Sequence, residues 1–203
     1  MLVAHATAVH QCAFPTFCRL VFRLIVGIGN WRSAVAEHPK SRSRAAFDAS
    51  LPHATSWAAA LIRDHLGRVL LLHKSGAGPR AWQLPGGHLD HREYPIGAAL
   101  RELAEEAGVV PGRPLRLVGL DFALPAHGWT GNRMGFFFDG GRLEAAYLDA
   151  CVELSGEHDD WGLRTMDDWR TVLKPPDWQR IHYLIDAADN GTVAYLHEMG
   201  ELR

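Results

Sequence analysis

Regular patterns of hydrophobic and polar positions begin near residue 56 and predict strands interleaved with helices. Short runs of apolar and β-branched residues bounded by turn residues predict strands, whereas apolar residues spaced three and four apart predict helices. We expect strands at 57–64, 69–75, 116–124, 133–140 and 143–154, and helices at 95–107, 166–173 and 176–191. This order lacks the regular alternation of a parallel doubly wound sheet. It favours an α/β fold with a mixed β-sheet between helices.

Residues 1–50 have a different character from the rest of the chain. Apolar residues between 17 and 28 recur at helical spacing, but Arg19 and Arg23 interrupt them and the run is short for a membrane span. Three interpretations stay open: a poorly packed or flexible extension, an accessory helix that packs on the main domain, and a targeting segment. We expect an N-terminal extension over 1–50 and one domain over 51–203.

Composition and charge favour a soluble protein with a small ligand. The formal net charge is −2, which gives no electrostatic reason to expect nucleic acid or a membrane surface as a partner. The three cysteines, Cys12, Cys18 and Cys151, form no paired motif, so neither a disulfide framework nor a thiolate zinc site is indicated. A cytoplasmic location is therefore expected.

The predicted helix at 95–107 carries an unusual cluster of acids. Pro95 suits its first turn and Gly108 suits the position just after its last turn. On a helical wheel Ile96, Leu100, Leu103 and Ala107 share one side, and the opposite side holds Glu102, Glu105 and Glu106. Like charges at this spacing repel, but they suit a hard divalent cation such as Mg²⁺, with Mn²⁺ able to substitute. A merely solvated helix face is the alternative explanation.

The surroundings of the helix favour the metal-binding explanation. Gly87, Glu93 and the segment RELAEEAGV at 101–109 occur at fixed spacings that reproduce every position of the Nudix box. In this respect the chain resembles the Nudix hydrolases. The resemblance implies an α/β/α sandwich and a metal-dependent hydrolase that cleaves a phosphoanhydride bond of a nucleoside diphosphate linked to another moiety. A nucleoside triphosphate and a sugar nucleotide such as ADP-ribose are both open as substrates. Members of this family often form homodimers, and a homodimer is accordingly expected here.

The resemblance also implies roles for individual residues. Glu102, Glu105 and Glu106 would bind the metal, the carbonyl of Gly86 would add a backbone ligand, and Glu93 would form an ion pair with Arg101. The base that accepts a proton from water would be Glu105 or Glu106, or a residue of the later loop LSGEHDDWGL. In that loop the candidates are Glu157 and Asp160.

Substrate contacts and one departure from the family complete the expectations. Lys74, Arg80 and Arg133 could meet phosphates, and Trp82, Trp129 or Phe137 could stack on a base. His88 and His91 lie where many members carry other residues, but loop histidines are usually unliganded. The other class of function is a catalytically inactive Nudix-fold module that senses a nucleotide or contacts a partner. The complete set of box carboxylates favours the enzyme.

Overall fold

The computed structural model describes residues 43–126 and 128–197. The chain divides into two units, Met1–Ser50 and Leu51–Arg203. In the first unit, helix α2 (Arg44–Asp48) starts at Ser43, whose hydroxyl accepts the amide hydrogen of Ala46. The apolar run at 17–28 and the first two cysteines lie outside the described residues. All further elements belong to the second unit.

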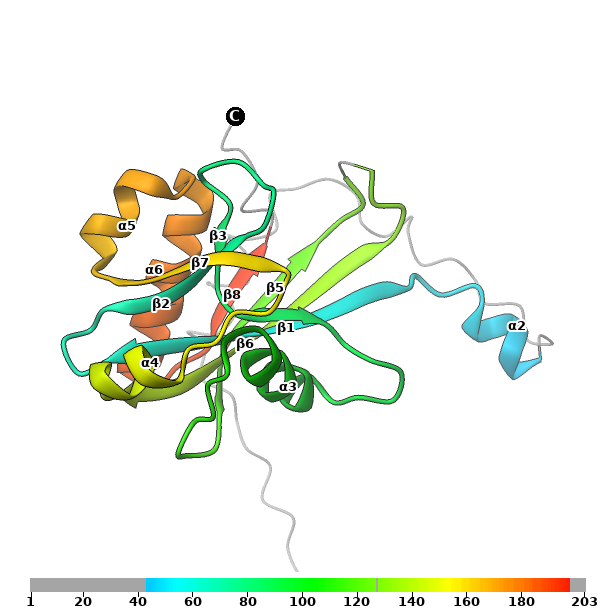
Figure 1. The fold of residues 1–203 in the computed structure, drawn as a ribbon. Coiled ribbons are helices and arrows are strands. Elements are labelled where there is room, and N and C mark those ends of the chain that lie inside the picture. Colours follow the sequence, from blue (N-terminus) through cyan, green and yellow to red (C-terminus); the bar gives the residue numbers. More distant parts are fainter. Residues whose placement is uncertain (1–42, 127, 198–203) are drawn as a thin grey trace, which may run out of the picture. The chain divides into compact units, whose positions relative to one another are not determined.

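An eight-stranded mixed sheet forms the centre of the second unit (Figure 1). Its main path runs β3-β2-β1-β6-β5-β8, and β4 and β7 pair with β1 and β2, respectively. The pairs β1/β6 and β5/β8 are parallel, and the other pairs are antiparallel. The strands are β1 (Ala54–Asp64), β2 (Val69–Lys74), β3 (Trp82–Gln83), β4 (Gly86–His88), β5 (Arg116–Ala123), β6 (Asn132–Leu143), β7 (His158–Arg164) and β8 (Ala194–His197).

Helices cover both faces of this sheet because β1 is apolar on both sides. Ala60 and Ile62 of β1 pack with residues of α3 (Pro95–Ala107) and α4 (Ala145–Cys151). The alternate residues Ala59 and Leu61 pack with residues of α5 (Met166–Val172) and α6 (Pro175–Asn190). Successive side chains of a strand point to opposite faces, so one strand anchors both helical layers. The expected α/β/α sandwich with a mixed sheet is confirmed (Figure 1).

Two sequence-based expectations about secondary structure are wrong. The segment 143–154, expected as a strand, contains helix α4, because the stretch AAYLDAC is rich in helix formers and buries only Leu148. The acidic segment 154–163, expected as a loop, continues into strand β7. Pairing with β2 overrides the weak strand propensity of its aspartates. Within the described residues no helix is long and apolar enough to cross a membrane.

Candidate active site

Helix α3 is positioned by its two ends and by its small residues. Pro95 occupies the first turn, and Gly108 ends the helix in the left-handed region at φ 64°, where glycine has no steric penalty. A Cβ on Gly108 would lie 2.6 Å from the carbonyl oxygen of Cys151. The end of α3 therefore lies directly against the end of α4.

The buried face of α3 differs from the helical-wheel expectation. Ile96 and Leu100 are 41% and 40% exposed, whereas alanines and Leu103 face the sheet. Small side chains let the helix approach the strands closely. The same packing buries Glu106, which is only 5% exposed. One of the three clustered glutamates therefore lies beneath the helix, and the three do not share a solvated face.

Arg101 connects this helix to the loop that precedes it. Its guanidinium binds both carboxylate oxygens of Glu93, at 3.0 and 2.9 Å, and donates to the carbonyl of His88 at 3.1 Å. Nη1 of Arg101 also donates to Oε1 of Glu102 at 2.9 Å and to Oε2 of Glu105 at 3.0 Å. The hydrogen bonds from Arg101 lower the pKa of Glu93. One side chain thus fixes the loop and neutralises part of the acidic cluster.

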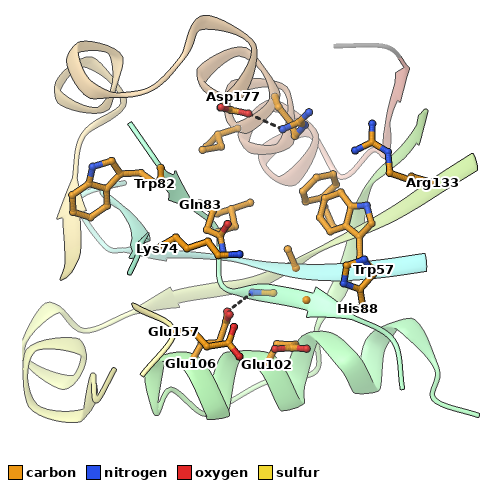
Figure 2. Close-up of a pocket in the computed structure, with 18 of the residues that line it drawn as sticks. Trp57, Lys74, Trp82, Gln83, His88, Glu102, Glu106, Arg133, Glu157 and Asp177 are labelled. Carbon is orange, nitrogen blue, oxygen red and sulfur yellow. Dashed lines mark hydrogen bonds and ion pairs between the residues drawn. The ribbon is translucent and has the colours of Figure 1, made fainter. Parts of the chain in front are cut away.

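A cavity of about 730 Å³ opens between α3 and α6 over the end of the sheet. Figure 2 shows that Glu102, Glu106 and Glu157 lie along one side of it, with Lys74 opposite them. The cations that line the cavity without forming an ion pair in the described part of the chain are Lys74, Arg80, Arg133 and Lys174. The cavity therefore combines a wall of carboxylates with free positive charges.

Burial and repulsion raise the pKa of Glu106 to about 7. Desolvation has the largest effect, and the negative charges of Glu102 and Glu157 add to it. The amide of Gly86, which donates to Oε2 at 2.7 Å, and the charge of Lys74 act in the opposite direction. Near neutral pH this carboxylate is held between its charged and neutral forms. A positive charge placed beside it would favour the charged form.

The donor set of the cavity fits a hard divalent cation. It presents carboxylate oxygens from two separate segments, and Gly87 brings the backbone so close that an added Cβ would collide with the carboxylate of Glu102. Oxygen ligands of this kind suit Mg²⁺ or Mn²⁺ better than Zn²⁺. Within residues 43–126 and 128–197, no three carboxylate, imidazole or thiol groups are gathered closely enough to enclose an ion. Arg101 holds Glu102 and Glu105 instead.

The structure distributes the residues predicted from sequence between the cavity and its surroundings. Glu105 is 59% exposed and does not line the cavity, and Asp160 is exposed and accepts the amide hydrogen of Trp161. His91 is also exposed and outside the cavity. The predicted residues that line the cavity are Lys74, Arg80, Trp82, Gly86, Gly87, His88, Arg101, Glu102, Glu106, Trp129, Arg133, Phe137 and Glu157.

Two of the expected stacking residues are mainly core residues. Phe137 is buried beneath Trp57 at a ring distance of 4.9 Å, and Trp82 packs on Trp169 at 5.0 Å. The more accessible aromatic groups are Trp57 and Trp129, and the guanidinium of Arg133 lies 5.5 Å from the ring of Trp129. Figure 2 shows Trp57, His88 and Arg133 together at one end of the cavity, away from Glu106.

Several cavity residues could not be found from local motifs. They are Trp57 of β1, Gln83 of β3, Asp177 and Arg180 of α6, and Lys174, which directly precedes α6. Asp177 and Arg180 form an ion pair at 2.9 Å on the first turns of α6. Only the spacing of three between these two residues, which places them on one helix face, was visible in the sequence.

Comparison with known proteins decides the family. The NUDIX domain matches residues 52–187, which is more than half of the chain. The protein belongs to the Nudix family. The resemblance noted from the box is thereby confirmed, and this Nudix domain includes every element from β1 to the last turns of α6.

The individual proteins that resemble this chain have low sequence identity to it. An RNA pyrophosphohydrolase of Agrobacterium fabrum is 27% identical over 110 residues, which cover 48% of this chain and 65% of the relative. The match thus spans less than two thirds of that protein. The Nudix domain of Shewanella oneidensis NrtR, solved with ADP-ribose, has a TM-score of 0.56 at 18% identity over 72% of this chain and 99% of its own. An Ap4A hydrolase of C. elegans has a TM-score of 0.53 at 24% identity, over 68% of this chain and 98% of its own. These two structures share the fold.

Proposed function

We propose that this Nudix domain is a Mg²⁺-dependent hydrolase that cleaves a phosphoanhydride bond of a nucleotide, with Mn²⁺ able to replace Mg²⁺. The observation that carries the proposal is the convergence of Glu102, Glu106 and Glu157 on one cavity that also contains free cations. The divalent cations would complement the carboxylates of the cavity, and the negatively charged phosphates would complement its unpaired cations. The RNA pyrophosphohydrolase relative supports the same class of bond.

The free cations favour a substrate with a polyphosphate chain. Lys74 lies across the cavity from the carboxylates (Figure 2), and Arg80 and Lys174 also line it. Cations without carboxylate partners attract an anion more strongly than paired ones, because no salt bridge must first be broken. A nucleoside triphosphate or a 5′-triphosphate end offers them more charge than a sugar nucleotide does. We therefore place triphosphates ahead of ADP-ribose.

The roles proposed for the side chains follow from their positions. Bound Mg²⁺ would supply charge stabilisation to the phosphate oxygens and lower the pKa of bound water. Glu102 and Glu106 would hold it, with the carbonyl of Gly86 as a further ligand, and Arg101 would keep the loop in place. Glu157 lines the cavity and forms no ion pair among the described residues, so it is the preferred proton acceptor, ahead of Glu106. We place Asp160 behind both, because it does not line the cavity.

A panel of substrates tests the proposal. Purified protein with Mg²⁺ would be given nucleoside triphosphates, ADP-ribose, a dinucleoside tetraphosphate and a 5′-triphosphorylated RNA oligonucleotide, and phosphate and pyrophosphate release would be measured. We expect turnover of at least one triphosphate, and its loss with a chelator. Binding of nucleotides without any turnover would instead support the sensing module.

Replacing Glu157 by Gln is expected to lower kcat by about 100-fold, because general-base catalysis contributes about 10²–10⁴-fold. Asp160→Asn is the matched control from the same segment and should retain nearly full activity, since Asp160 does not line the cavity. Steady-state kinetics on the best substrate of the panel provides the measurement. A larger loss in Asp160→Asn than in Glu157→Gln would refute this assignment.

A further inference from the structure

His158, the first residue of β7, is a buried imidazole beside the carboxylate wall. It is only 5% exposed. Its Nε2 lies 3.7 Å from Oε1 of Glu106 and 3.2 Å from the amide nitrogen of Gln83, a residue that lines the cavity. Its other ring nitrogen, Nδ1, is buried and has no hydrogen-bond partner among the described residues. His158 is neither a proposed metal ligand nor a proposed proton acceptor.

The surroundings of the ring decide which nitrogen carries the proton. With the proton on Nδ1, a buried N–H would have no acceptor, and the lone pair of Nε2 would face the carboxylate of Glu106. A buried donor without a partner costs about 1–3 kcal/mol, and the lone pair would repel the carboxylate. With the proton on Nε2, the N–H is attracted to the carboxylate of Glu106. The amide nitrogen of Gln83 faces Nε2 in the structure, and a half-turn of this amide presents its oxygen as the acceptor. The second tautomer therefore satisfies the site better.

Each oxygen of Glu106 then faces a protein N–H, one through a hydrogen bond and the other through a longer electrostatic contact of 3.7 Å. Oε2 accepts the amide hydrogen of Gly86 at 2.7 Å, and Oε1 faces Nε2 of His158. These donors come from two strands on different sides of the carboxylate, β4 and β7. A carboxylate that is hydrogen-bonded at one oxygen and attracted to an N–H at the other rotates less freely about its last torsion, so its lone pairs stay directed.

We propose that His158 is a positioning residue, which uses Nε2–H to fix the orientation of the Glu106 carboxylate toward the cavity. The proposal rests on the proposed function, in that Glu106 is taken as a metal ligand. Hydrogen bonds to the outer side of a ligand commonly change metal affinity or activity by about 10–100-fold. Gln83 is the second partner of the imidazole and links it to the cavity wall.

Three substitutions of His158 separate the effect of its hydrogen-bond donor from the effect of its packing. Gln places an amide nitrogen near the position of Nε2, Asn places one near Nδ1, and Leu fills the space without a donor. We expect His158→Gln to keep Mn²⁺ affinity and kcat within about threefold of the wild type. His158→Asn and His158→Leu should lose about tenfold or more in both. His65→Leu, at a surface pair with Glu144, is the control and should change neither.

Mn²⁺ binding is measured directly from the electron paramagnetic resonance signal of the free ion, without substrate, together with melting temperature and steady-state kinetics. Gln and Asn are both polar and close in size, so this pair carries the test even where His158→Leu fails to fold. Equal losses in His158→Gln and His158→Asn, or no loss in either, would overturn the proposal. Combining His158→Asn with Glu106→Gln should add little to the effect of Glu106→Gln alone, because both act on one ligand.

The metal-binding readout keeps this proposal separate from the proposed hydrolysis. A wild-type protein that binds Mn²⁺ but hydrolyses no substrate would refute the hydrolase, while the difference between His158→Gln and His158→Asn in Mn²⁺ affinity would still decide the role of His158. A wild-type protein that binds no Mn²⁺ would overturn both.

Discussion

Replacing Glu106 by Gln is expected to abolish Mg²⁺-dependent turnover and, in the presence of a chelator at pH 8, to make the protein more stable. Turnover falls because a proposed metal ligand is lost; a decrease on the order of 10³-fold corresponds to about 4 kcal/mol. Stability rises because the pKa of Glu106 is raised to about 7 in the folded protein, mainly by burial. The charged form is therefore unfavourable in the fold, and Gln removes that charge.

The raised pKa of Glu106 determines the pH range in which the substitution stabilises the protein. A carboxyl with a raised pKa in the folded state favours folding fully below its unfolded pKa of about 4.5, and this contribution is lost as the pH rises through about 7. At pH 8 the penalty removed by Gln is roughly 3 kcal/mol at most, which corresponds to a rise in melting temperature of at most about 6–12 °C. At pH 5 the two proteins should melt within about 1–2 °C of each other.

Thermal melts with chelator at pH 5 and pH 8, combined with kinetics in Mg²⁺, test both halves of this prediction. Glu144→Gln is the matched control, because Glu144 is exposed and pairs with a surface histidine; it should change neither stability nor turnover. A Glu106→Gln protein that is less stable than wild type at pH 8 would show that the buried carboxylate is compensated by groups other than a bound cation.

Replacing Arg101 by Met is expected to reduce both turnover and stability. Five hydrogen bonds are lost, which leaves Glu93 without its bidentate partner and leaves Glu102 and Glu105 uncompensated. We expect kcat to fall by about 100-fold, since small displacements of positioned groups have effects of this size. The melting temperature at pH 7 should fall by an amount of the order of 5 °C.

The conservative variant Arg101→Lys distinguishes geometry from charge. Lysine keeps the charge but cannot bind Glu93 through two parallel hydrogen bonds, so it should recover only part of the lost activity. The depressed pKa of Glu93 means that its pair with Arg101 stabilises the wild type above the unfolded pKa and that this contribution is lost as the pH falls through the folded pKa. Acid-induced unfolding should therefore be less steep in Arg101→Met. Full activity in Arg101→Lys would show that charge alone suffices.

The parts of the fold that could be predicted from sequence are those whose local signals agree with their tertiary packing. Helix α3 lies within the expected limits because Pro95 and Gly108 mark its ends. The central strands β1 and β2 are buried on both faces and appear as continuous apolar runs. The Nudix box spans one loop and one helix, so its fixed spacings were visible without knowledge of the fold.

The remaining features depend on partners distant in sequence. Strand β7 exists because β2 offers it a hydrogen-bonding edge, and no local pattern in its acidic residues indicates this. The burial of Glu106 follows from the approach of α3 to β4, where the amide of Gly86 donates a hydrogen bond to the carboxylate. Histidine 158 could have been noticed only as a single imidazole among acids, and its relation to Glu106 arises from the pairing of β7 with β2.

The hydrogen bonds at the end of α3 have a consequence for how this protein could diversify. The amides of Glu153 and Ser155 donate to the carbonyls of Ala107 and Glu106, at 3.3 and 3.4 Å. The segment leading to Glu157 is therefore attached by its backbone to the last turn of the helix that carries Glu106. Trp129, by contrast, lines the cavity from the segment 128–131. We expect that replacing this segment would alter substrate choice without disturbing the carboxylate arrangement. Loop-swap chimeras of this domain should change specificity while retaining metal affinity.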